Sequence, residues 1–172
     1  MVGSARRLRY AGVVKSLAPT DLAFFDSAAM RIVASARLSA SPTRVFDSFA
    51  DPAAWPHWFP LLKTARWVAG TPGIGAEREV EMVALGRFRE RFIAWEPGRR
   101  FAFTMIGSTS PLAVQLAEDY RLTADGGGTR VDWVMAATPT ALGKLTSAPT
   151  RLLMRRLFAR GGRRLEQLLT AL

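Results

Sequence analysis

The most regular feature of the chain is a series of short segments in which hydrophobic and polar residues alternate. In the first, which runs from Met30 to Leu38, small and aliphatic residues alternate with mostly polar ones, the period of a strand with one buried face. From residue 62 onward, turn residues separate six further strand-like runs at regular intervals, which predicts an antiparallel meander. These runs cover residues 63–69, 76–84, 87–95, 99–106, 115–123 and 129–137.

Three segments carry helical signals. Ser41–Pro42 has the residue types that begin a helix, and Asp51–Pro52 has those that end one. Two prolines limit residues 53–60 to a short helix or turn. The last segment predicts one long amphipathic helix from near Pro149 to the terminus. Its expected inner face consists of Leu153, Leu157, Gly161, Leu165, Leu168 and Leu172.

The length of 172 residues predicts a single domain. Residues 1–29 show no clean period, and we expect a weakly structured extension with a turn or two of helix around residues 22–29. Residues 30–172 then form an α+β domain, in which a curved antiparallel sheet of about seven strands wraps around the last helix. Two short helices follow the first strand.

Several classes of protein are excluded by composition. The chain has no cysteine and a single histidine, His57, which excludes disulfides, thiolate metal sites and sites built from several histidines. We therefore expect no metal and no cofactor. No run approaches eighteen consecutive apolar residues, and the N-terminal residues lack the apolar stretch of a signal peptide. A cytoplasmic protein is expected.

The net charge of +10 is concentrated at the end of the chain. Residues 149–172 contain six arginines and one acidic residue, Glu166. The arginine face of this helix is either solvated or in weak contact with anionic lipid head groups. No nucleic-acid-binding motif is present, so no nucleic-acid partner is expected. The chain is expected to be a monomer or a homodimer.

Four segments resemble a known superfamily. They are residues 51–58 (Asp-Pro-Ala-Ala-Trp-Pro-His-Trp), residues 73–75 (Gly-Ile-Gly), the hairpin at residues 91–101 and residues 127–133 (Gly-Gly-Thr-Arg-Val-Asp-Trp). Their order and spacing are similar to the START-like (SRPBCC) superfamily, in particular its polyketide cyclase/dehydrase and lipid-transport branch. The resemblance covers residues 30–172, and the first 29 residues lie outside it, which is compatible with a translation start nearer Met30.

This resemblance implies a helix-grip fold with a cavity between the concave sheet face and the last helix. Members of the branch hold lipids, polyketides or other hydrophobic molecules, and some of them cyclise polyketides while others only carry a ligand. Alternation along the strands and the last helix then gives an expected lining. It consists of Trp58, Val80, Met82, Phe88, Glu90, Phe92, Phe101, Phe103, Met105, Glu118, Tyr120, Trp133, Leu157 and Gly161. The alternative is that these side chains form a packed core without a cavity.

Glu90 and Glu118 stand out because they fall on faces that are otherwise apolar. A buried carboxylate needs a partner or a raised pKa. Together with Tyr120 they are candidates for binding a ligand hydroxyl or for acid–base catalysis. The structural alternative is that they pair with Arg78 or cap a backbone group.

Three further features have competing interpretations. Trp55 and Trp58 either gate the cavity or pack the short helices on the sheet, and His57 between them is expected to be exposed. Gly161 and Gly162 mark a close approach of the last helix to the sheet, room for a ligand, or a kink.

These observations favour a module that binds, transports or delivers a small hydrophobic molecule. A cyclase/dehydrase-like enzyme that uses the cavity carboxylates is the second hypothesis, and the sequence favours binding over catalysis. A peripheral binder of anionic membranes is the third.

Overall fold

The computed structural model describes residues 15–171. The strands are β1 (Lys15–Ser16), β2 (Met30–Leu38), β3 (Leu62–Ala69), β4 (Glu77–Met82), β5 (Gly86–Glu96), β6 (Arg100–Ser108), β7 (Ala113–Asp125) and β8 (Gly128–Pro139). The helices are α1 (Phe24–Ser27), α2 (Pro42–Ala50), α3 (Trp55–Trp58), α4 (Ala141–Leu145) and α5 (Ser147–Thr170). The strands form one antiparallel sheet in the order β2-β8-β7-β6-β5-β4-β3, with β1 paired to β6.

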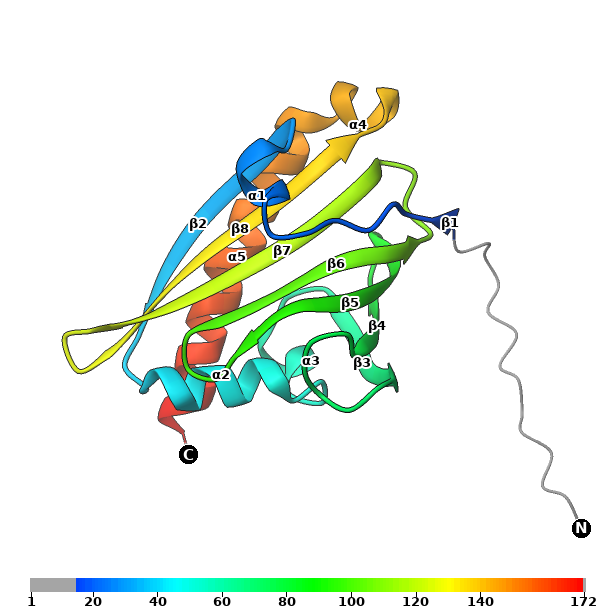
Figure 1. The fold of residues 1–172 in the computed structure, drawn as a ribbon. Coiled ribbons are helices and arrows are strands. Elements are labelled where there is room, and N and C mark those ends of the chain that lie inside the picture. The colour runs from blue at the N-terminus through cyan, green and yellow to red at the C-terminus, as the bar shows by residue number, and fades with distance from the viewer. Residues whose placement is uncertain (1–14, 172) are drawn as a thin grey trace, which may run out of the picture.

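The sheet is curved and open, and α5 crosses its concave side (Figure 1). The helices α2 and α3 lie near the C-terminal end of α5, and α4 lies at its N-terminal end. The expected α+β fold, its order of elements and all seven long strands are therefore confirmed. The helix α4 was not expected, because its five residues are too few to show a helical period.

Tight turns hold consecutive strands side by side, as the meander pattern predicted. Between β7 and β8, Gly126 and Gly127 have φ angles of +60° and +90°, a conformation that residues with a side chain rarely adopt. The strand pairing on both sides of this turn is continuous from Asp125–Gly128 to Gln115–Thr138. The turn therefore fixes the register of the two longest strands.

The inner face of α5 agrees with the expected one at Leu157, Gly161 and Leu165, and Leu168 is partly buried against the core. Its buried residues are Met154, Leu157, Phe158, Gly161, Leu165 and Leu169. Leu153, which was expected on the inner face, is 39% exposed, because steps of four residues drift around a helix of 3.6 residues per turn, and Met154 takes the inward position instead. Leu172 lies outside the described residues.

Aromatic rings from α2 and α3 fill one end of the concave face. Phe49 of α2 lies 5.2 Å from Tyr120 and 5.8 Å from Phe101, measured between ring centroids. Trp55 and Trp58 of α3 lie 4.6 Å apart and are both buried. This end of the sheet is consequently a solid core, and any open space must lie toward α4.

Strand β5 changes the face of its side chains partway along its length. The pairing of β5 with β6 shifts register between Phe92 and Ala94. Ala94 then packs with Phe25 on the convex side, whereas Trp95 lies 5.2 Å from Phe92 in the concave core. Alternation alone places Ala94 on the concave face, and the register shift is the reason that this expectation was wrong.

The described part of the N-terminal segment, residues 15–29, packs on the sheet rather than extending from it. The pairing of β6 with β7 covers residues 100–104 and 117–121. Beyond it, the backbone N–H groups of Leu17 and Ala18 donate to Ile106 of β6 and Val114 of β7. The chain then crosses the convex face, opposite to α5, where Phe25 of α1 is 1% exposed on a stripe of alanines (Figure 1).

Candidate functional site

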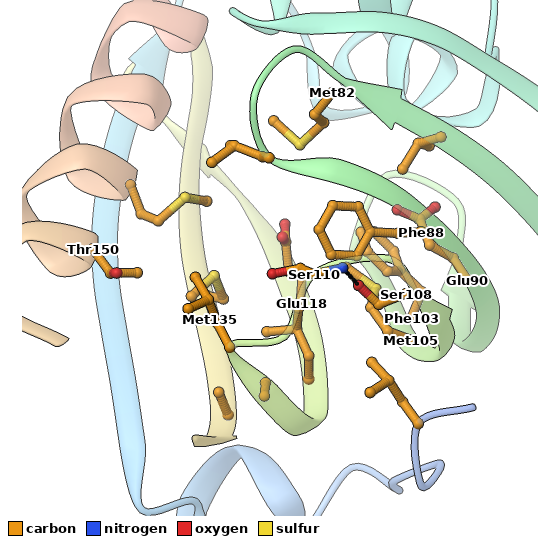
Figure 2. Close-up of a pocket in the computed structure, with 18 of the residues that line it drawn as sticks. Met82, Phe88, Glu90, Phe103, Met105, Ser108, Ser110, Glu118, Met135 and Thr150 are labelled. Atoms are coloured by element: carbon orange, nitrogen blue, oxygen red, sulfur yellow. Dashed lines mark hydrogen bonds between the residues drawn. The ribbon is translucent and has the colours of Figure 1, made fainter. Parts of the chain in front are cut away.

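A pocket opens on the concave side of the sheet, at the end that α2 and α3 leave unfilled. It has a volume of about 110 Å³ and lies between strands β4 to β8 and the helices α4 and α5 (Figure 2). Its wall is mostly apolar, with a few polar side chains on the strands and at the mouth. Part of the lining is partly exposed to solvent and lies toward the opening, including Leu85, the loop with Ser110 and Leu112, and Thr150 of α5.

Methionine is concentrated in this wall. The chain has six methionines, and all five internal ones line the pocket. They are Met30, Met82, Met105, Met135 and Met154, and they come from four strands and α5. Methionine has three rotatable bonds and a polarisable sulfur, so a wall built from it adapts to ligands of different shape.

Glu118 contributes a carboxyl group to the pocket from β7. Its Oε2 atom accepts hydrogen bonds from the Tyr120 hydroxyl at 2.7 Å and from Trp133 Nε1 at 2.9 Å. Burial raises the pKa of the Glu118 carboxyl to about 7, although these two donors lower it. Burial and the adjacent Glu118 raise the pKa of Tyr120, so its hydroxyl remains a donor at neutral pH.

Glu90 contributes the second carboxyl group, from β5. Its Oε2 atom accepts a hydrogen bond of 2.6 Å from Nε of Arg78, and both side chains are almost fully buried. Burial raises the pKa of Glu90 more than the guanidinium lowers it. Of the two interpretations of Glu90 that the sequence left open, the structure shows the pairing with Arg78.

Arg78 is enclosed by aromatic rings. Its guanidinium carbon lies 4.3 Å from the ring centroid of Trp55 and 5.3 Å from that of Phe103. Its two terminal nitrogens make no hydrogen bond to the described residues. The ring faces stabilise the buried charge in their place, and Arg78 is not among the residues that line the pocket.

The expected lining residues fall into two groups. The first lies around the pocket and comprises Val80, Met82, Phe88, Glu90, Phe103, Met105, Glu118 and Tyr120. The second is Trp58, Phe92, Phe101, Trp133, Leu157 and Gly161, which are buried but are not part of the pocket wall. They point inward as expected, and neighbouring rings and α5 cover them: Trp133, for example, stacks on Phe158 at 4.9 Å.

Other parts of the wall were not assigned from the sequence. Leu17 and Gly143 belong to segments for which the sequence predicts no regular element, and Ser108 lies where a turn was expected. Met30 and Met154 also line the pocket, and nothing in the local sequence pattern places either of them beside open space. Trp55 lines the pocket as well as packing α3, and His57 is exposed as expected.

Gly161 and Gly162 mark a close approach of α5 to its neighbours. A Cβ atom on Gly162 would lie 2.9 Å from Cβ of Ala36 in β2, and one on Gly161 would lie 3.4 Å from Cδ of Pro60. The glycines lie inside the uninterrupted helix α5 and away from the pocket. Close approach is therefore the interpretation that the structure supports.

Two further features are absent from residues 15–171. No group of three or more His, Asp or Glu side chains comes together there to hold a metal ion. Within the same residues, no helix combines the length and the apolar character needed to cross a membrane.

Comparisons with known proteins agree with this architecture. The family model described as polyketide cyclase/dehydrase and lipid transport matches residues 29–170. Uncharacterized proteins of Mycobacterium tuberculosis and Mycobacterium bovis are 36% identical over 116 residues, which is 67% of this chain and 70% of theirs.

Solved structures share the fold at low sequence identity. A protein of Thermus thermophilus is 20% identical and superimposes with a TM-score of 0.70 over 83% of this chain and 98% of its own. The protein XoxI of Bacillus cereus is 16% identical, with a TM-score of 0.66 over 80% of this chain and 94% of its own.

Proposed function

This chain belongs to the polyketide cyclase/dehydrase and lipid-transport family, and from that premise we propose that it binds a small hydrophobic molecule in the pocket between the sheet and α5. The observation that carries the proposal is the composition of the wall, which is mostly apolar and includes every internal methionine. Pockets of this composition bind ligands by removing apolar surface from water.

The volume of the pocket bounds the size of the ligand. About 110 Å³ is smaller than the cavities of about 150 Å³ that accept benzene. A ligand with one ring and a short chain therefore fits only if methionine side chains move or if its end reaches the mouth. We infer that the ligand is a compact molecule, and that the methionines make room for it.

Propylbenzene, a neutral hydrocarbon of this size, tests the proposal. With 13C-labelled methionine methyl groups, titration with propylbenzene should shift the signals of the five internal methionines in a saturable way. Unchanged methionine signals at saturating propylbenzene would contradict the proposal.

A matched pair of variants shows whether the binding occurs in this pocket. Thr150→Trp places a large ring at the mouth and should weaken binding at least about tenfold, because the ring occupies the volume that the ligand needs. Thr170→Trp makes the same change at the far end of α5, where the residue is exposed, and should leave binding unchanged.

A second candidate function, contact with anionic membranes, is favoured by the surface around the mouth. Leu145 of α4 is 83% exposed, and Leu142, Leu152 and Val83 are about half exposed. No acidic residue occurs between Asp132 and Glu166. Basic residues are frequent in that interval: Lys144, Arg151, Arg155, Arg156, Arg160, Arg163 and Arg164. Exposed leucines beside arginines suit an anionic bilayer, whose head groups attract the charge and whose chains accept the leucines.

Vesicle co-sedimentation tests this second function. We expect binding to vesicles that contain phosphatidylglycerol, weaker binding to pure phosphatidylcholine, and a decrease at high salt. Leu145→Ser should reduce the binding. Ile74 is 73% exposed and lies before the first residue of β4, whereas Val83 follows its last. Ile74→Ser should therefore leave vesicle binding unchanged. Equal binding to the two kinds of vesicle would exclude this role.

A further inference from the structure

The polar part of the pocket wall is built by three neighbouring strands. Glu90 of β5 and Glu118 of β7 lie on either side of β6, since Glu90 pairs with Met105 and Glu118 pairs with Phe103. Both carboxyl groups belong to the pocket wall, among Phe88, Phe103 and Met105 (Figure 2). A hydrophobic ligand in this pocket therefore has two carboxyl groups beside it.

Each carboxyl group uses only one of its two oxygens to bind the protein. Glu118 accepts both of its hydrogen bonds at Oε2, and Glu90 accepts its bond from Arg78 at Oε2. Within residues 15–171, Oε1 of either residue makes no hydrogen bond. Because Glu90 is 3% exposed and Glu118 is 8% exposed, these free oxygens have only the pocket in which to find a partner. Neither oxygen is among the fully buried atoms without a partner, so water in the pocket can reach both. A ligand group that replaces this water and pairs with the oxygens gains affinity.

The charge of the surroundings decides which ligand group this is. Arg78 and Glu90 form an ion pair, so their charges cancel, and the guanidinium lies against aromatic rings and is not part of the pocket wall. Glu118 adds either no charge or a negative charge, since burial raises its pKa to about 7. A carboxylate or phosphate group would meet no unpaired positive charge beside these carboxyls. An ammonium group would have to lose its hydration to enter an apolar pocket.

We propose that the ligand of this pocket carries one neutral hydroxyl group, an alcohol or a phenol, which binds Oε1 of Glu118, with Glu90 as the second polar neighbour. The inference rests on the proposed function and adds the chemical class of the ligand. A hydroxyl group fits both protonation states of Glu118: it donates to the carboxylate and accepts from the carboxylic acid. The apolar remainder of the ligand then lies against the methionines, toward the mouth.

Four ligands with one skeleton test the inference at neutral pH: propylbenzene, 4-propylphenol, 4-propylbenzoate and 4-propylbenzylamine. Their affinities are measured by the same methionine methyl titration. The phenol should bind at least about fivefold more tightly than propylbenzene, the gain of one buried hydrogen bond. The benzoate and the ammonium should both bind more weakly than the phenol, by about tenfold or more.

Variants of the two carboxyl groups make the assignment specific. Glu118→Gln keeps the shape of the side chain and removes its charge. It should reduce the ratio between the affinities for 4-propylphenol and 4-propylbenzoate at least about fivefold. Glu90→Gln leaves the charge of Arg78 uncompensated and should strengthen benzoate binding. The control Glu81→Gln changes a half-buried glutamate that pairs with Lys63 outside the pocket. It should change neither the ratio of the two affinities nor the affinity for the benzoate.

The outcomes separate this inference from the proposed function. If propylbenzene and the other three ligands all fail to bind, both are wrong. If propylbenzene binds, and the benzoate or the amine binds with the same affinity as the phenol, the pocket binds hydrophobic molecules and the hydroxyl assignment is wrong. A phenol preference that persists unchanged in Glu118→Gln would also overturn the assignment.

Discussion

Glu118 occupies the most unusual environment of any single residue in the pocket. A carboxyl group with two hydrogen-bond donors on one oxygen would ordinarily have a low pKa. Here burial in an apolar wall outweighs both donors, with a smaller contribution from the adjacent Glu90. The pocket therefore contains a group that exchanges a proton near neutral pH, and this property affects the stability of the protein as well as its choice of ligand.

We expect Glu118 to make stability depend on pH. Its pKa rises from 4.5 to about 7 on folding, so between these values the folded protein retains a proton that the unfolded chain releases. This contribution to stability is fully present below pH 4.5 and is lost as the pH rises through about 7. The loss is about 3 kcal/mol, at 1.36 kcal/mol for each unit of pKa.

Urea unfolding at about pH 4 and about pH 8 measures this effect. The unfolding free energy of Glu118→Gln, relative to the unsubstituted protein, should increase by about 3 kcal/mol between the two pH values. Glu81→Gln should show a much smaller change, because its side chain is partly in water. A pH-independent difference for Glu118→Gln would show that the carboxyl does not keep its proton in the folded state.

At the scale of the element, α5 is positioned by contacts at several points along its length. Phe158 stacks on Trp133, and Nη2 of Arg44 in α2 donates a hydrogen bond to the carbonyl of Leu169 near the last turn. Between them, Gly162 brings the helix against Ala36 of β2. The glycine pair thus serves helix packing, and the open space of the pocket lies toward the first turns of α5.

The two glycines should respond oppositely to alanine. Gly161→Ala places its Cβ at ordinary contact distance and should stabilise the protein by up to about 1 kcal/mol through higher helix propensity. Gly162→Ala brings its Cβ within 2.9 Å of Ala36, so α5 or β2 must shift and the gain is lost or reversed. Urea midpoints of the two variants measure the difference. Equal stabilisation by both would mean that α5 is not held close to β2.

At the scale of the whole molecule, the concave face is divided between a solid end and an open end. Aromatic rings from α2 and α3 fill the solid end, and methionines surround the open end next to α4. The N-terminal segment completes the open end, since the backbone N–H groups of Leu17 and Ala18 bridge β6 and β7, and Leu17 lines the pocket. One face of one sheet therefore supplies both the core that stabilises the fold and the space that binds a ligand.

This shared face links binding to global stability. A ligand that binds only the folded protein should raise the unfolding free energy by about 2.7 kcal/mol at a free concentration one hundred times its Kd. We expect 4-propylphenol to produce this increase in the unsubstituted protein and in Thr170→Trp, and a much smaller one in Thr150→Trp at the same concentration. Calorimetry in the presence and absence of the phenol measures it. An equal increase in both variants would place the binding site elsewhere.

Local sequence patterns were enough to predict the elements and the inward side of most of them. Alternation identified all seven long strands, and the isolated charges on apolar faces identified Glu90 and Glu118 as residues that require partners. Such patterns are local, because backbone geometry alone sets the period of a strand or helix. They fail where geometry changes within an element, as at the register shift that turns Ala94 to the convex side.

Which inward residues surround open space depends on how the elements pack together. Phe101 and Phe103 lie on the same face of β6, yet Phe103 lines the pocket and Phe101 is packed among the rings of α2 and α3. Likewise, nothing in the local pattern shows that five methionines far apart in the chain meet in one wall. Periodicity reports the direction of a side chain, whereas a cavity depends on what the other elements leave unfilled, and that is a property of the assembled fold.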